Sequence, residues 1–332
     1  MSTLQPQQFE LVPCENCRSA SFSTIRDSVD GSKIVRCLDC GLEFVNPMPT
    51  EEWLRQLYSH ELANDEQELP YFLNYIQERK DRGSSFDKLH NSRLDLIERF
   101  SKRPAVNNGA APASGARGNL LDVGCGAGFF LKTAQSRGWN PYGIDFLPEY
   151  NRFAKEELKL ENVHSSTLEE MNYPPLSFDV VTLWDLIEHL RHPLSTLKEI
   201  NRILRPGGLV VIWTPNVKNA ALLKDRWIGY LMPLHLYFLS NQALNNLLTQ
   251  SGFQTVYEKT NRSKKGFFPR AGAVPYQKPA QTPTRIQKIK HGIKRDLANF
   301  INPINYISPL LDQLGYGFNL FVIAVKQNSS SE

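Results

Sequence analysis

The sequence predicts an α/β fold with a parallel sheet, preceded by a small cysteine-rich module. Three observations lead to this prediction: strands alternate with helices from Asn119 onward, a glycine-rich turn follows the first of these strands, and four cysteines form two close pairs near the N-terminus. The 332 residues are 41% hydrophobic and 22% charged, the composition of an ordinary globular protein of about two units. This composition excludes global disorder, collagen and a coiled coil.

The four clustered cysteines predict a zinc-ribbon-like module over residues 1–49. Two residues separate Cys14 from Cys17 and Cys37 from Cys40, and nineteen residues lie between the two pairs. A tetrahedral Zn²⁺ ion requires four thiolates, and each C-x-x-C turn offers two of them. Because so short a module cannot easily build a sufficient core, the metal would supply folding energy. The alternative is four reduced structural cysteines without a metal.

The module and the predicted sheet are separated by two further segments. Residues 50–102 are expected to be a mostly helical lead-in, with apolar side chains at helical spacing over 86–100. Residues 103–118 are rich in Ala, Gly, Pro and Asn, which predicts a flexible linker. Within the module, short strands are expected at 23–29 and 33–36.

Residues 119–260 and 315–328 are expected to form one α/β domain. Its predicted strands lie at 120–123, 142–145, 179–184, 208–214, 253–258 and 318–326. Its predicted helices lie at 129–137, 149–158, 194–204 and 241–251. Strands that alternate with helices in this way are typical of a parallel sheet with crossover connections.

A basic insertion, residues 261–314, is predicted between the last two strands. Residues 261–300 contain ten Lys or Arg and one acidic residue, a net charge of +9, whereas the whole chain carries +4. Apolar residues recur at near-helical spacing within 285–314, which predicts an amphipathic helix. Such a helix either packs on the domain or lies on anionic lipid.

The sequence indicates a cytoplasmic protein. No apolar run approaches the ~18 residues that span a bilayer, and the N-terminal sequence MSTLQPQQFE has neither the basic nor the apolar region of a signal peptide. The expected location is therefore the cytoplasm, with peripheral contact at the inner membrane surface through 261–314 as the alternative. The cysteines are accordingly expected to be reduced.

A glycine-rich turn follows the first predicted strand and predicts a nucleoside-binding site. After Asp122 come Gly124, Gly126 and Gly128, and glycines allow a tight turn and close approach of a ligand to the backbone. Asp145 ends the next strand, where a carboxylate is well placed for a ribose diol. The spacing differs from both the dinucleotide and the P-loop patterns, so a ligand without phosphates is favoured.

The segments DVGCGAG, FDVVTLWDLIEHL and LRPGGLVVIWTPN resemble the class I S-adenosylmethionine-dependent methyltransferases. The resemblance implies a Rossmann-like seven-stranded methyltransferase sheet with a C-terminal β-hairpin, and S-adenosylmethionine as cofactor. By motif, it implies cofactor contacts for Asp122, Gly124, Gly126, Gly128, Asp145, Thr167, Leu168 and Trp184.

The chain resembles the ubiquinone-biosynthesis O-methyltransferases and their sugar- and lipid-modifying relatives more closely still. In that group an arginine before the fold binds the methionine carboxylate, and Arg93 in HNSRLDLIERF matches it. The alternative is a solvated helix arginine. These relatives also place a divalent-metal or base site after the fourth strand, which corresponds to Asp185, Glu188 and His189 here. The resemblance thus leaves Mg²⁺ open as a further cofactor.

Two histidines are candidate general bases. His189 is one, with Glu188 to orient it. His235, in the aromatic-rich segment WIGYLMPLHLYFLS, is the other, because relatives with a similar phrase line their acceptor pockets with it. For residues 185–189, the alternative is that the acidic side chains only stabilise a helix N-terminus through its dipole. For His235, the alternative is a histidine packed in an apolar segment without a catalytic role.

The predicted function is O-methylation of a sugar, a glycolipid or another small hydroxylated acceptor. Methylation of a base amine is disfavoured, since Trp184-Asp185-Leu186-Ile187 stands where those enzymes have an Asn/Asp-Pro-Pro-Tyr turn. Cytosine C5 methylation is disfavoured because the remaining cysteine, Cys125, lies in the glycine turn. The alternative function is an RNA methyltransferase in which the ribbon and the basic insertion bind RNA.

Overall fold

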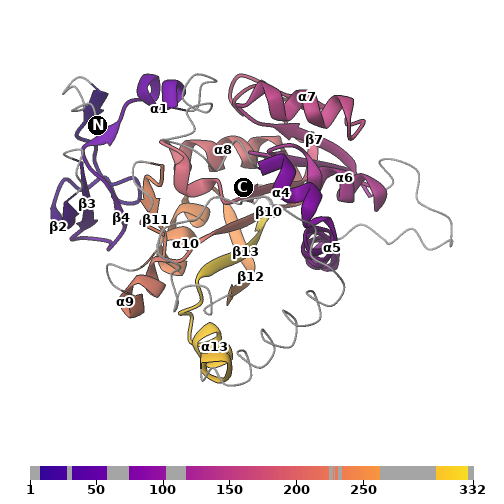
Figure 1. The fold of residues 1–332 in the computed structure, drawn as a ribbon. Helices are drawn as coiled ribbons and strands as arrows, with labels where there is room; N and C mark the ends of the chain where they lie inside the picture. The colour runs from indigo at the N-terminus through magenta and orange to yellow at the C-terminus, as the bar shows by residue number, and fades with distance from the viewer. Residues whose placement is uncertain are drawn as a thin grey trace.

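The computed structural model describes residues 8–27, 32–57, 75–101, 117–223, 227, 229–230, 234–261 and 304–327 (Figure 1). Most of the predicted linker and residues 262–303 of the predicted insertion lie outside the described residues. Among the helices of the described part, none is long and apolar enough to cross a membrane.

A seven-stranded sheet forms the centre of the fold, as predicted. Its strands are β6 (Asn119–Val123), β7 (Asn140–Ile144), β8 (Val163–His164), β9 (Phe178–Trp184), β10 (Leu204–Pro215), β12 (Phe253–Asn261) and β13 (Asn319–Lys326). They lie in the order β12-β13-β10-β9-β6-β7-β8. The strands from β10 to β8 pair in parallel, whereas β13 is antiparallel to both β10 and β12, which makes the expected C-terminal hairpin.

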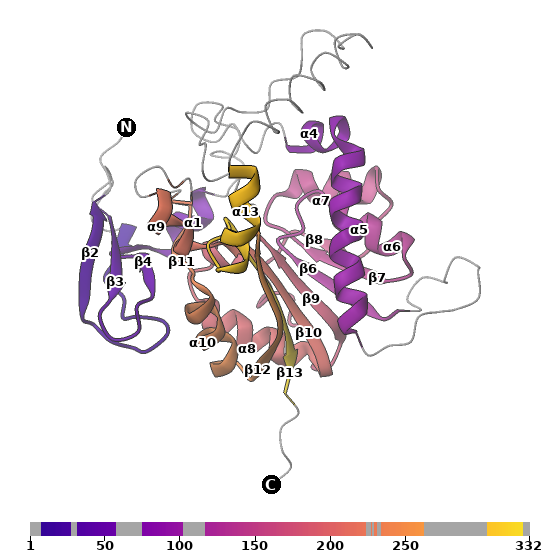
Figure 2. The same ribbon diagram turned by 90° about the horizontal axis from the view of Figure 1, so that it is seen from below.

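Helices cover both faces of this sheet (Figure 2). One face packs against α5 (Gly83–Phe100), α6 (Phe129–Ser136) and α7 (Pro148–Glu156), through residues such as Ile97 and Leu131. The other face packs against α8 (Pro193–Ile203) and α10 (Asn241–Gln250). Because both faces are covered, six of the seven residues of β9 are buried, which explains why the strand is mostly apolar.

Shorter elements surround this core. They are α1 (Glu51–Leu57), α4 (Tyr75–Asp81), α9 (Ala220–Leu223), α13 (Ile304–Gln313) and the 3₁₀ turns η2 (Ile187–His189) and η3 (Val217–Asn219). Helix α4 precedes α5 and lies near the carboxyl ends of the parallel strands. Helix α13 falls in the last part of the predicted insertion and contacts β12.

The cysteine-bearing module builds a second sheet from β2 (Phe22–Asp27), β3 (Lys33–Cys37) and β4 (Glu43–Val45). Its fourth strand is β11 (Tyr237–Phe238), so the order is β11-β4-β3-β2 (Figure 1). A separate two-stranded ribbon pairs β1 (Phe9–Glu10) with β5 (Met48–Pro49). Side chains of the module and of α8 and α10 join one hydrophobic cluster, so the module packs directly on the α/β domain.

Candidate functional site

The glycine turn between β6 and α6 places backbone amides at the carboxyl end of the sheet. Gly126 and Gly128 have φ angles of +53° and +81°, which L side chains rarely adopt. The amide of Gly126 donates to Asp145 Oδ2 at 2.8 Å, and the amide of Leu147 donates to Oδ1 at 3.0 Å. Asp145 is thereby fixed beside the turn, and burial raises the pKa of its carboxyl group.

Asp122 lies beneath the turn. It is 1% exposed, and Thr182 Oγ1 donates to its Oδ1 at 2.6 Å. Burial raises the pKa of Asp122 to about 7, and the hydrogen bond from Thr182 opposes that shift. Asp122 therefore holds β6 against β9 directly below the glycines.

Arg93 and Trp184 form a polar pair next to this turn. Arg93 projects from α5, and its guanidinium carbon lies 4.0 Å from the centroid of the Trp184 ring and 5.1 Å from that of Trp213. Arg93 is 9% exposed, so it is not a solvated helix arginine. The buried indole N–H of Trp184 has no hydrogen-bond acceptor within the described residues. A buried cation and an unused donor side by side fit the carboxylate of an amino-acid ligand.

A tyrosine that the sequence did not single out covers the turn. A Cβ atom built on Gly126 would lie 2.6 Å from the hydroxyl oxygen of Tyr75, which belongs to α4. The Tyr75 ring lies 4.9 Å from that of Tyr150, and the Arg79 guanidinium sits 3.7 Å from its centroid. Only the spatial approach of α4 to the turn identifies this residue, because no motif contains it.

Thr167 and Leu168 follow β8 on the far side of Asp145. The Thr167 side chain and amide close a turn with Glu170 at 3.1 and 3.0 Å, and Leu168 is buried in the core. Their predicted contact with an adenine ring stays a prediction.

The two candidate bases, His189 and His235, lie in direct contact. Their ring centroids are 4.7 Å apart and the ring planes meet at 82°. Each Nδ1 lies close to a backbone carbonyl, that of Leu234 at 2.9 Å for His189 and that of Gly229 at 2.7 Å for His235. Since a carbonyl only accepts, both Nδ1 atoms carry the proton and both Nε2 atoms carry a lone pair.

The environment keeps these imidazoles neutral. Burial lowers the pKa of His189 to about 3, with the neighbouring His235 adding to the shift, and burial lowers that of His235 to about 4. Glu188 is 1% exposed, and its Oε2 accepts from Thr214 Oγ1 at 2.9 Å. Its Oε1 has no partner among the described residues. Burial raises the pKa of Glu188 well above its usual range, with Asp185 adding to the shift.

Asp185 does not join this cluster. The residue is exposed with a φ of +52°, and the expected helical turn is instead the short 3₁₀ turn η2. Ligand atoms of Glu188, His189 and His235 lie within 4.8 Å of one another. One carboxylate and two imidazoles do not fit Mg²⁺, which prefers oxygen ligands in octahedral geometry.

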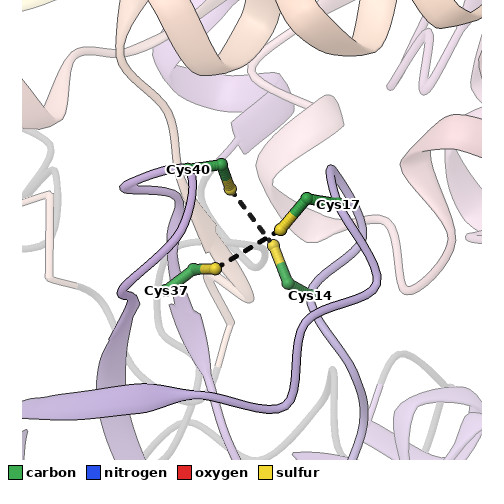
Figure 3. A group of neighbouring side chains, drawn as sticks. All are labelled: Cys14, Cys17, Cys37 and Cys40. Carbon is green, nitrogen blue, oxygen red and sulfur yellow. Dashed lines mark hydrogen bonds between the residues drawn. The ribbon is translucent and has the colours of Figure 1, made fainter.

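The four predicted cysteine ligands converge, as Figure 3 shows. The Sγ atoms of Cys14 and Cys40 are 3.4 Å apart, those of Cys17 and Cys37 are 3.5 Å apart, and all four lie within 4.8 Å of one another. These spacings approach the edge of a tetrahedron with Zn–S bonds of about 2.3 Å, about 3.8 Å. Burial raises the pKa of Cys40 to about 11, so a cation is needed to hold the thiolate. The set fits Zn²⁺.

Comparison with known proteins identifies the α/β domain. The family model described as Methyltransferase domain matches residues 89–258. A ubiquinone biosynthesis O-methyltransferase of Aromatoleum aromaticum is 30% identical over 207 residues, 58% of this chain and 83% of that protein. The corresponding enzyme of Chromobacterium violaceum is 30% identical over 174 residues, 48% of this chain and 67% of that protein.

A solved structure of a SAM-dependent methyltransferase from Archaeoglobus fulgidus aligns with a TM-score of 0.47 at 20% identity, covering 76% of this chain and 99% of that one. The family match starts at residue 89, so the cysteine module lies outside it. The chain belongs to the S-adenosylmethionine-dependent methyltransferases.

Proposed function

We propose that this enzyme methylates a hydroxyl group of a small hydroxylated acceptor, such as a sugar or a glycolipid. The observation that carries the proposal is the contact between His189 and His235, both neutral and both with a lone pair on Nε2. A hydroxyl is a weak nucleophile whose proton must leave as the methyl group transfers, and a positioned imidazole is suited to accept it. A charged histidine could not serve.

The position of the pair relative to the glycine turn supports this role. Leu186, three residues before His189, lies against the turn, since a Cβ atom built on Gly124 would approach Leu186 Cδ1 to 3.0 Å. The residue that directly precedes η2 is therefore next to the predicted cofactor site. Glu188, whose Oε1 is without a partner in the described part of the chain, stands within reach to accept a hydrogen bond from the imidazolium that forms.

The predicted cofactor site would bind S-adenosylmethionine, which supplies an electrophilic methyl group on a sulfonium. Arg93 and the Trp184 indole N–H would bind the amino-acid carboxylate, and Asp145 would accept from the ribose hydroxyls. Tyr75 would close over the turn and exclude water. The protein's contribution is then chiefly orientation of two substrates, together with one proton transfer.

We also propose that the four cysteines hold one structural Zn²⁺. RNA as the acceptor loses support, because β11 already occupies one edge of the module's sheet and holds it against the α/β domain. Contact with a lipid-linked acceptor at a membrane is a prediction from residues 261–314, most of which lie outside the described residues.

The test is transfer of a labelled methyl group from S-adenosylmethionine to a panel of sugars, nucleotide-linked sugars, lipid-linked sugars and RNA, with an acid- and base-stable ether as the expected product. Calorimetric titration with S-adenosylhomocysteine checks the cofactor site separately. Absence of binding would refute the whole proposal, whereas binding together with methylated RNA and no methylated small acceptor would refute the acceptor class.

A further inference from the structure

The cysteine module contacts both segments that carry the candidate bases. His235 lies in the stretch that leads into β11, and His189 lies in η2. These segments touch each other, because the amide of Leu236 donates to the carbonyl of Glu188 at 2.8 Å. Both are also anchored on the module by independent contacts.

The first anchor is the pairing of β11 with β4. Tyr237 pairs with Phe44 and Phe238 with Glu43 in antiparallel register, and the Val45 amide donates to the carbonyl of Leu236 at 2.9 Å. The rings of Phe44 and Tyr237 stack with centroids 6.1 Å apart. A two-residue strand has no stability of its own, so the position of the segment after His235 depends on β4.

The second anchor is Arg191, two residues after His189. Its guanidinium donates to the carbonyl of Pro49 in β5 and forms an ion pair with Glu10 in β1. The Arg191 side chain is 8% exposed and that of Glu10 is 55% exposed, so the guanidinium itself is largely shielded from water. The Tyr237 hydroxyl donates to the Arg191 carbonyl at 3.1 Å, which joins the two anchors.

The third anchor starts inside a cysteine turn. Asn16, between Cys14 and Cys17, is 7% exposed, and its Nδ2 donates to the carbonyl of Ala243 in α10 at 3.2 Å. Gln250, at the other end of α10, donates from Nε2 to the Asn16 carbonyl at 3.0 Å. The turn that would hold the metal is thus hydrogen-bonded to both ends of α10, the helix that follows β11.

We propose that the four-cysteine module is one wall of the acceptor site, and that its bound metal holds the His189–His235 pair in its working geometry. Arg191 and Asn16 are then positioning residues for the reaction. The inference rests on the proposed function only in assigning a catalytic role to the two histidines. Its structural part, metal-dependent order of residues 234–239, stands independently.

The physical basis is the small size of the module. Strands β2 to β4 hold few residues, and Cys37 is the last residue of β3, so metal ligation fixes the strand on which β4 pairs. Without the metal, the conformational entropy of the cysteine turns favours their release, and β11 loses its partner. The cofactor turn at 124–128 is held by β6, β7 and Asp145 and shares none of these contacts.

The experiment compares the full-length zinc-loaded protein with the same protein after chelation and with Cys17→Ser, which removes the exposed cysteine. Hydrogen exchange measures residues 234–239, and titration measures S-adenosylhomocysteine affinity. The expected result is exchange about tenfold faster at 234–239, with affinity changed less than about twofold. Unchanged protection at 234–239 in metal-free protein would overturn the proposal.

A second variant keeps the inference testable should metal-free protein unfold. Arg191→Gln leaves the cysteines intact, so zinc content and cofactor affinity should stay at the wild-type level while kcat falls about tenfold and KM for the acceptor rises. Arg191→Lys, which retains a cation, should recover part of kcat. The matched control is Arg55→Ala, which breaks the exposed ion pair of α1 with Glu170 and touches neither anchor.

Wild-type kcat in Arg191→Gln would contradict the positioning role. Failure of the wild-type protein to bind S-adenosylhomocysteine would instead refute the proposed function, and the hydrogen-exchange comparison would still decide whether the metal orders residues 234–239.

Discussion

His189 and His235 meet edge to face with ring centroids 4.7 Å apart, and each donates a hydrogen bond from Nδ1 to a backbone carbonyl. This contact unites the two histidines that the sequence offered as rival bases. In the proposed mechanism one imidazole would accept the proton of the acceptor while the other packs against it, and burial keeps both neutral at physiological pH.

Replacement of either histidine by glutamine should lower kcat without weakening cofactor binding. Glutamine retains a hydrogen-bonding group but cannot accept the proton, so a fall of about 100-fold or more is expected. Steady-state kinetics and titration with S-adenosylhomocysteine measure the two effects. His192→Gln is the control, since the His192 side chain is about half exposed and lies 3.6 Å from the exposed carboxylate of Glu51, away from the pair. Full activity in both His189→Gln and His235→Gln would remove the pair from the mechanism.

Asp145→Asn should weaken S-adenosylhomocysteine binding by about 10- to 100-fold. The carboxylate oxygens accept from the amides of Gly126 and Leu147. In asparagine an NH₂ group would replace one oxygen, so that two hydrogen-bond donors would face each other. Calorimetric titration measures the change. Asp95→Asn serves as the control, because Asp95 is an exposed carboxylate on α5 that pairs with Arg137. Equal affinity in the two variants would show that Asp145 is not part of the cofactor site.

Arg93→Lys should weaken the binding of ligands that carry a carboxylate more than the binding of ligands that lack one. Lysine keeps the charge but loses the planar guanidinium that lies over Trp184 and pairs with a carboxylate through two bonds. The affinity for S-adenosylhomocysteine should fall about tenfold, whereas that for methylthioadenosine, which lacks the carboxylate, should hardly change. A parallel loss for both ligands would point to a structural role for Arg93.

The purified protein should contain one zinc ion per chain, and Cys37→Ser should remove it. Because metal binding is coupled to folding of the module, removal should lower the melting temperature by several degrees. Elemental analysis and thermal unfolding measure both quantities. Cys125→Ser is the control for zinc content, since Cys125 is buried in the glycine turn away from the four ligands. The metal assignment would be refuted by a wild-type protein that contains no zinc and has the same melting temperature as Cys37→Ser.

His235 should make the protein less stable as the pH falls below about 6.5. Its folded-state pKa is about 4 against an ordinary value of 6.5, so the unfolded chain binds the proton first, and this lowers its free energy relative to the folded state. The stabilisation is therefore complete above pH 6.5 and lost as the pH falls toward 4. Glu188, whose pKa is raised, and His189, whose pKa is lowered, both lie beside His235 and add their own pH dependence, so a matched variant is necessary.

Denaturant unfolding of wild type and His235→Gln at pH 7.5 and 5.5 isolates this contribution. The difference in unfolding free energy between the two proteins should shift by about 1 kcal/mol against the wild type at the lower pH. A difference independent of pH would mean that His235 is exposed to solvent in the folded protein.

Local sequence patterns predicted most of the central fold. The alternation of buried strands with amphipathic helices placed β6, β9, α8 and α10 within one or two residues of their observed bounds, because burial on both faces makes such strands mostly apolar. The two-residue strands β8 and β11 carry too few residues for any periodicity and were not predicted. The position of Tyr75 over the glycine turn was not predicted either, because no motif surrounds this residue.

The amino-acid sequence alone predicted the methyltransferase sheet, the glycine turn with Asp145 and the cluster of four cysteines, since local motifs carry each of them. The packing of the whole chain was needed to show that His189 meets His235, that Asp185 stays outside their cluster, and that β4 takes β11 as its partner. These relationships arise from packing between segments that lie far apart in the chain. Hydrogen bonds and buried contacts between such segments leave no periodic pattern in either one.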